Sequence, residues 1–272
     1  MTRLLLLFSL LISAFLPATS RATDGYRVFV CGHSFHLFID QPLQALALEA
    51  GHADHRIAGK QTLGNSTCQQ IWNLPDAPTD AKHALTAGNV DVLTLSPHAA
   101  IPDPGIDLFA NLAAQHSPTI RVFLQVSWSP KMVQNPDSAF WRLRSVEYMD
   151  VLRGQARALN KQHQRDYVFL VPVGPAVLTL WEQITAGKVP GVPDVQLLFS
   201  DAGLHPSPTL KNLVAYCWFA AIYGQSPVGL KALDGKVSAE TNRVLQQIAW
   251  DAVRAEPLNG LSPTPPSSPK SL

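Results

Sequence analysis

Charged residues are scarce in this chain. Asp, Glu, Lys and Arg make up 15% of its 272 residues, and the formal net charge is +1, whereas ordinary domains carry about 25% charged residues. No basic patch or acidic tail stands out, so the composition gives no reason to expect a nucleic-acid partner. With 46% hydrophobic residues and no internal repeat, the chain is long enough for one full core.

Cysteine is scarcer still. Cys31, Cys68 and Cys217 are the three in the sequence. An odd and small number argues against a disulfide framework, and the spacing matches no zinc motif. Two interpretations stay open for Cys31 and Cys68, namely a disulfide between them or two separate buried thiols.

No hydrophobic run at the N-terminus is long enough to cross a bilayer. The apolar run at residues 4–16 has 13 residues, whereas a spanning helix needs about 20. Arg3 precedes the run, Pro17 ends it, and Ser20-Arg21-Ala22 offers a small-x-small cleavage site. This pattern predicts a cleaved signal peptide at residues 1–22, an extracytoplasmic (periplasmic or secreted) protein and no stable membrane anchor. The alternative is an uncleaved N-terminal helix.

Apolar, β-rich runs alternate with helical patterns along the rest of the chain. The runs are residues 26–31, 55–60, 90–95, 120–126 and 167–171. Continuous apolar runs are typical of parallel strands covered on both faces. We therefore predict a three-layer α/β/α sandwich, flavodoxin-like, with a mostly parallel five-stranded sheet. In such sheets, sites lie at the carboxyl ends of the strands.

The domain boundaries follow from composition. Residues 23–256 carry the strand and helix patterns and are predicted to form one domain. Residues 257–272 are rich in Pro and Ser and have little apolar content, so we predict a disordered tail.

The first chemical motif directly follows the first predicted strand. Residues 32–35 read Gly-His-Ser-Phe and precede a helical segment. A serine at this place, Ser34, would lie at the carboxyl edge of the sheet, where its backbone N–H can help to hold an oxyanion. An ordinary helix-capping serine is the alternative.

The second motif lies near the end of the predicted domain. Asp201 and His205 stand in a polar loop before a helical segment that begins near Pro208. A histidine can act as the general base for a serine hydroxyl, and a carboxylate can fix its tautomer. A lone loop histidine is usually just solvated, so the pairing with Ser34 is what makes the motif informative.

Together the two blocks resemble the SGNH, or GDSL-type, serine hydrolase (esterase) family. Its members place a nucleophilic serine in a Gly-x-Ser block after the first strand and an Asp-x-x-His block before the last helices. The block order and spacing match over residues 26–229, and the segment 215–230 is similar to a bacterial exported subset. The resemblance implies Ser34 as nucleophile, His205 as base, Asp201 as acid, and the backbone N–H groups of Ser34 and Gly64 as oxyanion-hole donors.

The sequence departs from the family pattern twice. The last block is one residue longer, so His205 could instead be oriented by a backbone carbonyl, and losing Asp201 is expected to cost less than losing His205. The asparagine expected after the third strand is replaced by Ser-Pro-His, with His98 as a substitute oxyanion donor and Asn65 as another. Losing one such donor costs about 10²–10³ in rate.

The resemblance implies ester hydrolysis through an acyl-serine intermediate, with no cofactor, on a small-molecule or glycan ester such as a carbohydrate O-acetyl group. One alternative is a weak or inactive glycan-binding protein on the same fold, in which Trp128 could stack on a sugar or simply cap the core. Another is a metal-dependent hydrolase that uses histidines. The candidate ligands are His33, His36, His98 and His205.

We expect the mature protein to begin near Thr23, because the tripartite pattern places cleavage after Ala22. N-terminal sequencing of the protein isolated from its native host measures this directly. An intact Met1 on exported protein would contradict the cleavage.

Overall fold

The computed structural model describes residues 25–77, 80–98, 100–231, 233 and 236–261. The predicted signal peptide lies outside these residues, as does the part of the predicted tail from residue 262 onward. Of the helices in the described ranges, none has both the length and the apolar character needed to cross a membrane.

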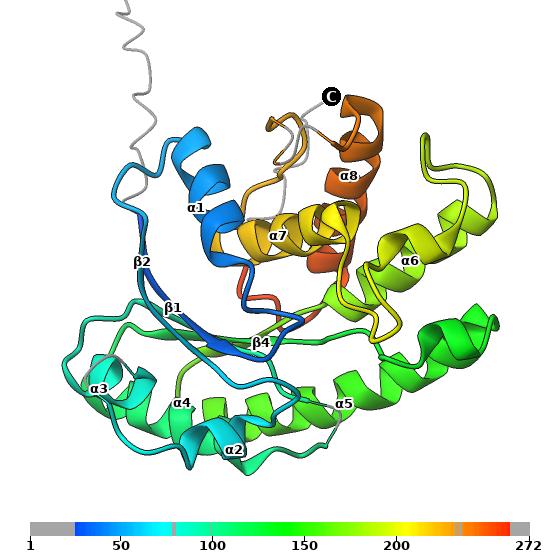
Figure 1. Ribbon diagram of the computed structural model, residues 1–272. Helices are drawn as coiled ribbons and strands as arrows, with labels where there is room; N and C mark the ends of the chain where they lie inside the picture. The colour runs from blue at the N-terminus through cyan, green and yellow to red at the C-terminus, as the bar shows by residue number, and fades with distance from the viewer. Residues whose placement is uncertain (1–24, 78–79, 99, 232, 234–235, 262–272) are drawn as a thin grey trace, which may run out of the picture.

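A parallel five-stranded sheet forms the centre of the protein (Figure 1). Its spatial order is β2-β1-β3-β4-β5, and every neighbouring pair of strands is parallel. This is the flavodoxin-like order, so the predicted fold is confirmed. Each of the five predicted apolar runs contains most of one strand. The strands are β1 (Arg27–Gly32), β2 (Arg56–Thr62), β3 (Val92–Leu95), β4 (Arg121–Gln125) and β5 (Val168–Val171).

Helices cover both faces of the sheet (Figure 1). On one face lie α1 (Asp40–Glu49), α6 (Val173–Thr185), α7 (Pro208–Tyr223) and α8 (Ala239–Ala255). On the other lie α2 (Cys68–Trp72), α3 (Ala81–Thr86), α4 (Pro104–His116) and α5 (Ser138–Gln162). Two 3-10 turns complete the described elements, η1 (Met132–Gln134) and η2 (Val195–Leu198).

The alternation of side chains along the central strands produces the two cores. On β1, Val28 and Val30 belong to the core under α1, α7 and α8, whereas Phe29 and Cys31 belong to the core above α2–α5. All four side chains are buried, because helices cover both faces of β1. This double covering explains why the strand reads as a continuous apolar run in the sequence.

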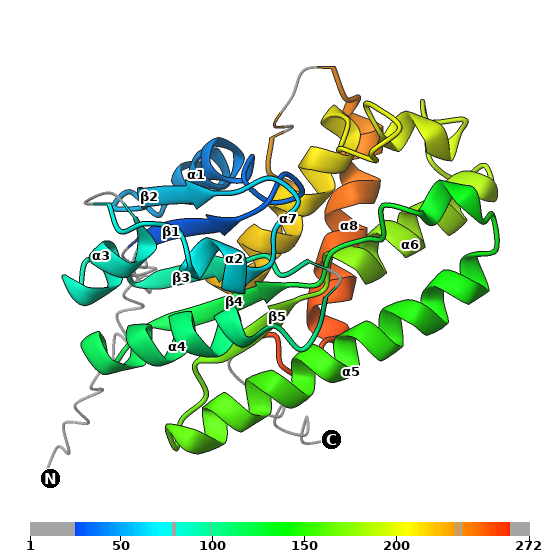
Figure 2. The same cartoon turned by 60° about the horizontal axis from the view of Figure 1, so that its bottom comes forward.

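Helix α5 extends past the edge of the sheet. Figure 2 shows its first half beside α6, beyond the carboxyl ends of the strands. Its second half packs against the sheet through Leu152, Ala156 and Leu159. The first half has no strand beneath it, and it carries exposed apolar side chains such as Phe140 and Leu143. The first half of α5 is therefore available to form the wall of a site.

The folded domain extends beyond the predicted boundary at residue 256. The carbonyl of Leu258 accepts a hydrogen bond from the Leu170 N–H at 2.7 Å, and the carbonyl of Gly260 accepts one from Arg121 at 3.0 Å. Leu258 and Leu261 pack against the two cores. The predicted tail therefore begins too early, because two leucines in this Pro- and Ser-rich stretch are enough to tie residues 257–261 to β4 and β5.

The three cysteines are free and buried. Burial in apolar surroundings raises the pKa of the Cys31 and Cys217 thiols well above the ordinary value. In the structure Cys31 and Cys68 are therefore two separate buried thiols, and no disulfide joins them.

Candidate active site

Ser34 lies in the turn that leaves the carboxyl end of β1. Helix α1, the helical segment expected after this block, begins at Asp40, so a turn separates Ser34 from the helix. Gly32 allows the chain to pass close to the end of β3, since a Cβ at Gly32 would meet the Cβ of Ser96 at 2.7 Å. Ser34 itself is half-buried, with its hydroxyl facing the loop that carries His205.

His205 lies in a closed loop between η2 and α7. An antiparallel bridge between Phe199 and Pro206 joins the two ends of this loop. Just inside the bridge, the Ser200 N–H donates to the carbonyl of His205 at 2.8 Å. The loop is thus short and fixed at its base, which limits where the imidazole can point.

Ser34, His205 and Asp201 form one continuous line of hydrogen bonds. The Nδ1 of His205 lies 2.7 Å from Oδ2 of Asp201, and its Nε2 lies 3.0 Å from the Ser34 hydroxyl oxygen. A carboxylate can only accept, so Nδ1 carries the proton and Nε2 accepts from Ser34. This is the geometry that a serine–histidine–acid hypothesis requires. The catalytic roles of the three side chains stay predictions.

The extra residue between Asp201 and His205 is accommodated by a left-handed residue. Leu204 has a φ of 58°, which costs a non-glycine residue about 1–2 kcal/mol. The turn is closed by Asp201, whose Oδ1 accepts from the N–H groups of Gly203 at 2.9 Å and His205 at 3.2 Å. Leu204, and not Gly203, therefore makes the adjustment. The hydrogen bond from His205 lowers the pKa of the Asp201 carboxyl, so this group is ionised at neutral pH.

Trp128, just beyond the end of β4, holds the His205 loop in place. Its indole N–H donates to the carbonyl of Leu204 at 3.1 Å, and its ring stacks on Phe35 with centroids 4.4 Å apart. Phe35 in turn meets the His205 ring edge-on at 5.7 Å. Only 4% of the surface of Trp128 is exposed, so its contacts match the core-capping interpretation better than stacking on a sugar.

Gln125, the last residue of β4, holds the Ser34 turn. Its side-chain N–H₂ donates to the Phe35 carbonyl at 3.0 Å and to the Ser127 hydroxyl at 2.9 Å. Its Oε1 accepts from the Trp218 indole at 2.8 Å and lies 3.1 Å from Nδ1 of His36. Because Trp218 can only donate and the carbonyl can only accept, these partners fix the orientation of the amide. The buried amide therefore has all of its hydrogen bonds satisfied.

His36 and His33 are buried neutral side chains next to Ser34. The Gln125 oxygen requires a proton on Nδ1 of His36, which leaves its Nε2 to accept from Thr94 at 2.7 Å. Burial, the largest cause, lowers the pKa of His36 to about 3. Burial, followed by repulsion from His98, lowers the pKa of His33 to about 4. Both imidazoles are neutral at pH 7 and serve the packing of the turn.

The metal-dependent alternative has no ligand set in the described part of the chain. No three His, Cys, Asp or Glu side chains gather there in an arrangement that could hold a metal ion. His36 is bonded to Gln125 and Thr94, and His205 to Asp201 and Ser34.

A cavity of about 980 Å³ opens in front of Ser34 and His205. Its walls come from the loop after β3, the loop after β4, the first half of α5 and the start of α6. His98 and Asn65, the two predicted side-chain donors, both line it. The adjacent residues Gly64 and Asn65 are both solvent-exposed, and of the two only Asn65 lines the cavity.

Sequence reasoning missed the residues that hold the site together. Tyr148 on α5 donates from its hydroxyl to the carbonyls of Pro97 and His98, at 3.1 and 3.2 Å, and so fixes the loop that carries His98. Gln125 was also missed, as was Ser96, whose hydroxyl oxygen lies 3.2 Å from Nε2 of His33. The one feature of the sequence that could have indicated such a residue is a glutamine at the end of an otherwise apolar strand, because a buried amide needs hydrogen-bond partners.

Comparisons with known proteins support the fold. No family model matches the sequence, and no curated protein is significantly similar to it. A crystal structure of a DUF4886 family protein from Bacteroides uniformis is 12% identical, with a TM-score of 0.54 over 85% of this chain and 96% of that chain. A protein of Slackia heliotrinireducens, provisionally described as an SGNH hydrolase, is 16% identical, with a TM-score of 0.44 over 72% of this chain and 98% of that chain. The first match shows a shared fold, and neither shows a shared activity.

We predict that the stability of the protein falls with acidity below pH 6.5, the ordinary pKa of histidine. Burial holds the pKa of His36 at about 3 in the folded state, and those of His33 and His55 at about 4. Below pH 6.5 the unfolded chain therefore binds more protons than the folded protein. Each such histidine removes about 1.4 kcal/mol of stability per pH unit between its unfolded and its folded pKa. Urea unfolding between pH 7 and pH 4 measures the slope.

Replacing His36 tests the assignment of this slope. His36→Gln should be less stable than the wild type at pH 7, but its slope between about pH 6 and pH 4 should be smaller by about 1.4 kcal/mol per pH unit. The control is Val92→Ala, which removes buried volume without removing a titrating group and should leave the slope unchanged. An unchanged slope in His36→Gln would contradict the buried neutral imidazole.

Proposed function

We propose that the protein is a serine hydrolase that cleaves an ester bond by acyl transfer, with Ser34 as the nucleophile. One observation carries the proposal, namely the hydrogen-bonded line from Asp201 through His205 to Ser34, with Ser34 and His205 lining a large cavity. The half-exposed serine is accessible to a substrate, and its partner nitrogen is the unprotonated one.

The reaction follows from the roles of these three groups. As the Ser34 oxygen attacks the ester carbonyl carbon, Nε2 of His205 takes the hydroxyl proton, and Asp201 stabilises the resulting imidazolium. The tetrahedral intermediate then collapses, and the leaving alkoxide takes the proton from His205 and departs as the alcohol. Water attacks the acyl-serine with His205 again as base, which releases the acid and restores Ser34.

The oxyanion of the intermediate needs donors on the cavity side of Ser34. We assign this role to the backbone N–H of Ser34, assisted by His98 or Asn65; Gly64, the backbone donor that the resemblance implies, is not among the residues that line the cavity. Both assisting side chains line the cavity, and His33 contacts His98 edge-on with ring centroids 5.7 Å apart. Because each donor is worth about 10²–10³ in rate, the catalytic rate depends on whether one of these two side chains donates to the oxyanion.

The replacement of the expected asparagine by His98 favours a second candidate, a weak or inactive glycan-binding protein on the same fold. The spacing of the acid block no longer favours it, since Asp201 reaches His205 in spite of the extra residue. Export stays a prediction that rests on the signal-peptide pattern at residues 1–22. A glycan or small-molecule ester as substrate and independence of a cofactor stay predictions that rest on the resemblance alone.

Three substitutions test the proposal with p-nitrophenyl acetate as substrate. Ser34→Ala and His205→Ala should each lower kcat by about 10⁴ or more, because each removes a group that acts in the proton transfer or the bond formation. Asp201→Ala should cost about 10³–10⁴, close to a regular triad, because its hydrogen bond to His205 is as short as in one. This penalty is larger than the one that the sequence spacing suggests.

The matched control is Ser226→Ala, which changes an exposed serine outside the cavity and should keep wild-type turnover. Circular dichroism would verify that every variant is folded. Wild-type turnover in Ser34→Ala would exclude Ser34 as the nucleophile. Folded wild-type protein without turnover of any ester would favour the binding-protein candidate.

A further inference from the structure

The size of the cavity exceeds what an acetyl group needs. Its volume of about 980 Å³ lies at the upper end of the roughly 300–1,000 Å³ of pockets that hold drug-sized ligands. The loop after β4 and α5 supply more than half of the residues that line it. A bound acetate ester would leave much of the cavity filled with water.

The walls of the cavity are mainly apolar. The side chains that line it away from the triad include Ile101, Met132, Phe140, Trp141, Val151 and Leu178. They come from four separate segments of the chain, so the apolar lining is a property of the cavity and not of one helix face. Such a lining stabilises an apolar ligand group in proportion to the area that it removes from water.

Several polar groups of the lining are engaged with the protein itself, although the Ser145 hydroxyl, which also lines the cavity, has no hydrogen-bond partner. The Tyr148 hydroxyl donates to the carbonyls of Pro97 and His98, and the Trp141 indole N–H donates to the carbonyl of Asn135 at 2.9 Å. The Arg144 guanidinium is paired with Glu147 at 2.7 Å. These aromatic side chains therefore offer ring surface, whereas a sugar would need free donors and acceptors for its hydroxyl groups.

Two apolar side chains at the cavity are only partly covered. Phe140 is 42% exposed and Val151 is 39% exposed, and both line the cavity from α5. Exposed apolar side chains scattered over a surface need no explanation, but here they gather at an opening beside a nucleophile. An apolar ligand group in the cavity would cover them.

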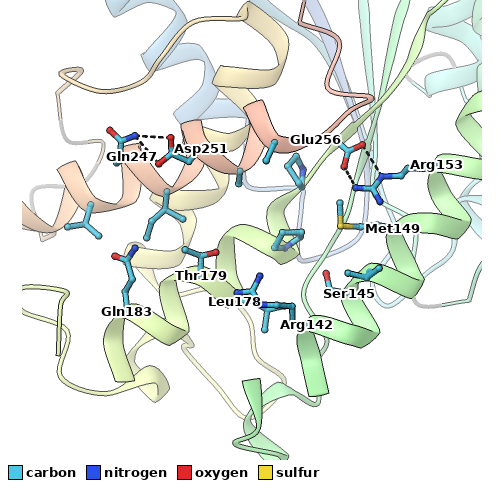
Figure 3. Close-up of a pocket in the computed structure, with 17 residues that line it drawn as sticks. Arg142, Ser145, Met149, Arg153, Leu178, Thr179, Gln183, Gln247, Asp251 and Glu256 are labelled. Atoms are coloured by element: carbon cyan, nitrogen blue, oxygen red, sulfur yellow. Dashed lines mark hydrogen bonds and ion pairs between the residues drawn. The ribbon is translucent and has the colours of Figure 1, made fainter. Parts of the chain in front are cut away.

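A second hollow, of about 540 Å³, lies on the other side of α5 and has a different character. Figure 3 shows two bonded pairs of polar side chains in it, Arg153 with Glu256 and Gln247 with Asp251. None of the three triad residues lines it. Ser145 and Leu178 line both hollows and form the wall between them. The cavity in front of Ser34 is therefore the place where a substrate group meets the nucleophile.

We propose that this cavity binds a bulky apolar group of the substrate, so that the enzyme prefers long-chain or aromatic esters over acetylated carbohydrate. The inference rests on the proposed ester hydrolysis at Ser34 and adds the substrate class. The apolar group can belong to the acyl part or to the alcohol part of the ester, and two series of substrates distinguish these sources.

In the acyl series, p-nitrophenyl acetate, butyrate and hexanoate are compared at concentrations below micelle formation. Each methylene buried in the cavity should raise kcat/KM by about fourfold, so hexanoate, with its four additional methylenes, should exceed acetate by up to about 250-fold. In the alcohol series, ethyl, butyl and hexyl acetate are compared by the release of acetic acid. A rise in either series supports the inference and identifies which part of the ester enters the cavity.

Helix α5 supplies a matched pair of variants. Phe140→Ala removes a ring from the cavity wall, and the hexanoate-to-acetate ratio of kcat/KM should fall roughly tenfold. Leu143→Ala removes an even more exposed side chain from the same helix, 60% exposed and outside both hollows, and should leave that ratio unchanged. An equal effect of the two variants would contradict the role of the cavity.

The outcomes separate this inference from the proposed function. Rates that stay flat or fall with chain length in both series would overturn the inference, as would faster turnover of glucose pentaacetate than of any apolar ester. If acetate hydrolysis nevertheless depends on Ser34, the proposed function still holds. Absence of Ser34-dependent turnover for every ester would overturn the function instead. In that case, tryptophan fluorescence measures the binding of decanoate to the wild type and to Phe140→Ala. Binding that Phe140→Ala weakens would uphold the apolar site, and absence of binding would overturn it.

Discussion

The hydrogen bonds at the end of β4 are the constraint on which the candidate site depends. Gln125 holds the turn that carries Ser34, through the carbonyl of Phe35 and the ring of His36. Three residues later, Trp128 holds the loop that carries His205, through the carbonyl of Leu204. Ser34 and His205 are 171 residues apart in the chain. Their contact at 3.0 Å is therefore set by two loops that are anchored to the same strand end.

The sequence predicted the fold and the identity of the three aligned side chains, because both leave local signals. Central parallel strands must be apolar on both faces, and they read as continuous runs. Ser34 and His205 stand in short polar blocks next to a strand and a helix. The anchoring roles of Gln125 and Tyr148 could not be predicted, since only the tertiary fold brings their partners near them, among these the carbonyls of Phe35 and Pro97. The left-handed conformation of Leu204 was missed for a different reason, namely that leucine has no preference for it that a sequence could reveal.

The apolar cavity depends on the length of α5. Its second half is fixed to the sheet by buried leucines, and its first half projects beyond the strand ends, where it faces Ser34 across the cavity. The composition of that first half, with Phe140 and Trp141 on the cavity side, sets the chemistry of the substrate group that can fit. In the proposed function, the scaffold thus fixes Ser34 as the nucleophile, while the projecting helix determines which ester can reach it.

The most direct test of this account is covalent labelling with a fluorophosphonate, followed by peptide mass spectrometry. A serine activated by His205 should form the phosphonyl adduct within minutes on the peptide that contains Ser34, and His205→Ala should abolish the adduct although Ser34 is still present. Such a result would establish Ser34 as an activated nucleophile independently of any substrate. A label on another serine, or wild-type labelling of Ser34 in His205→Ala, would contradict the account.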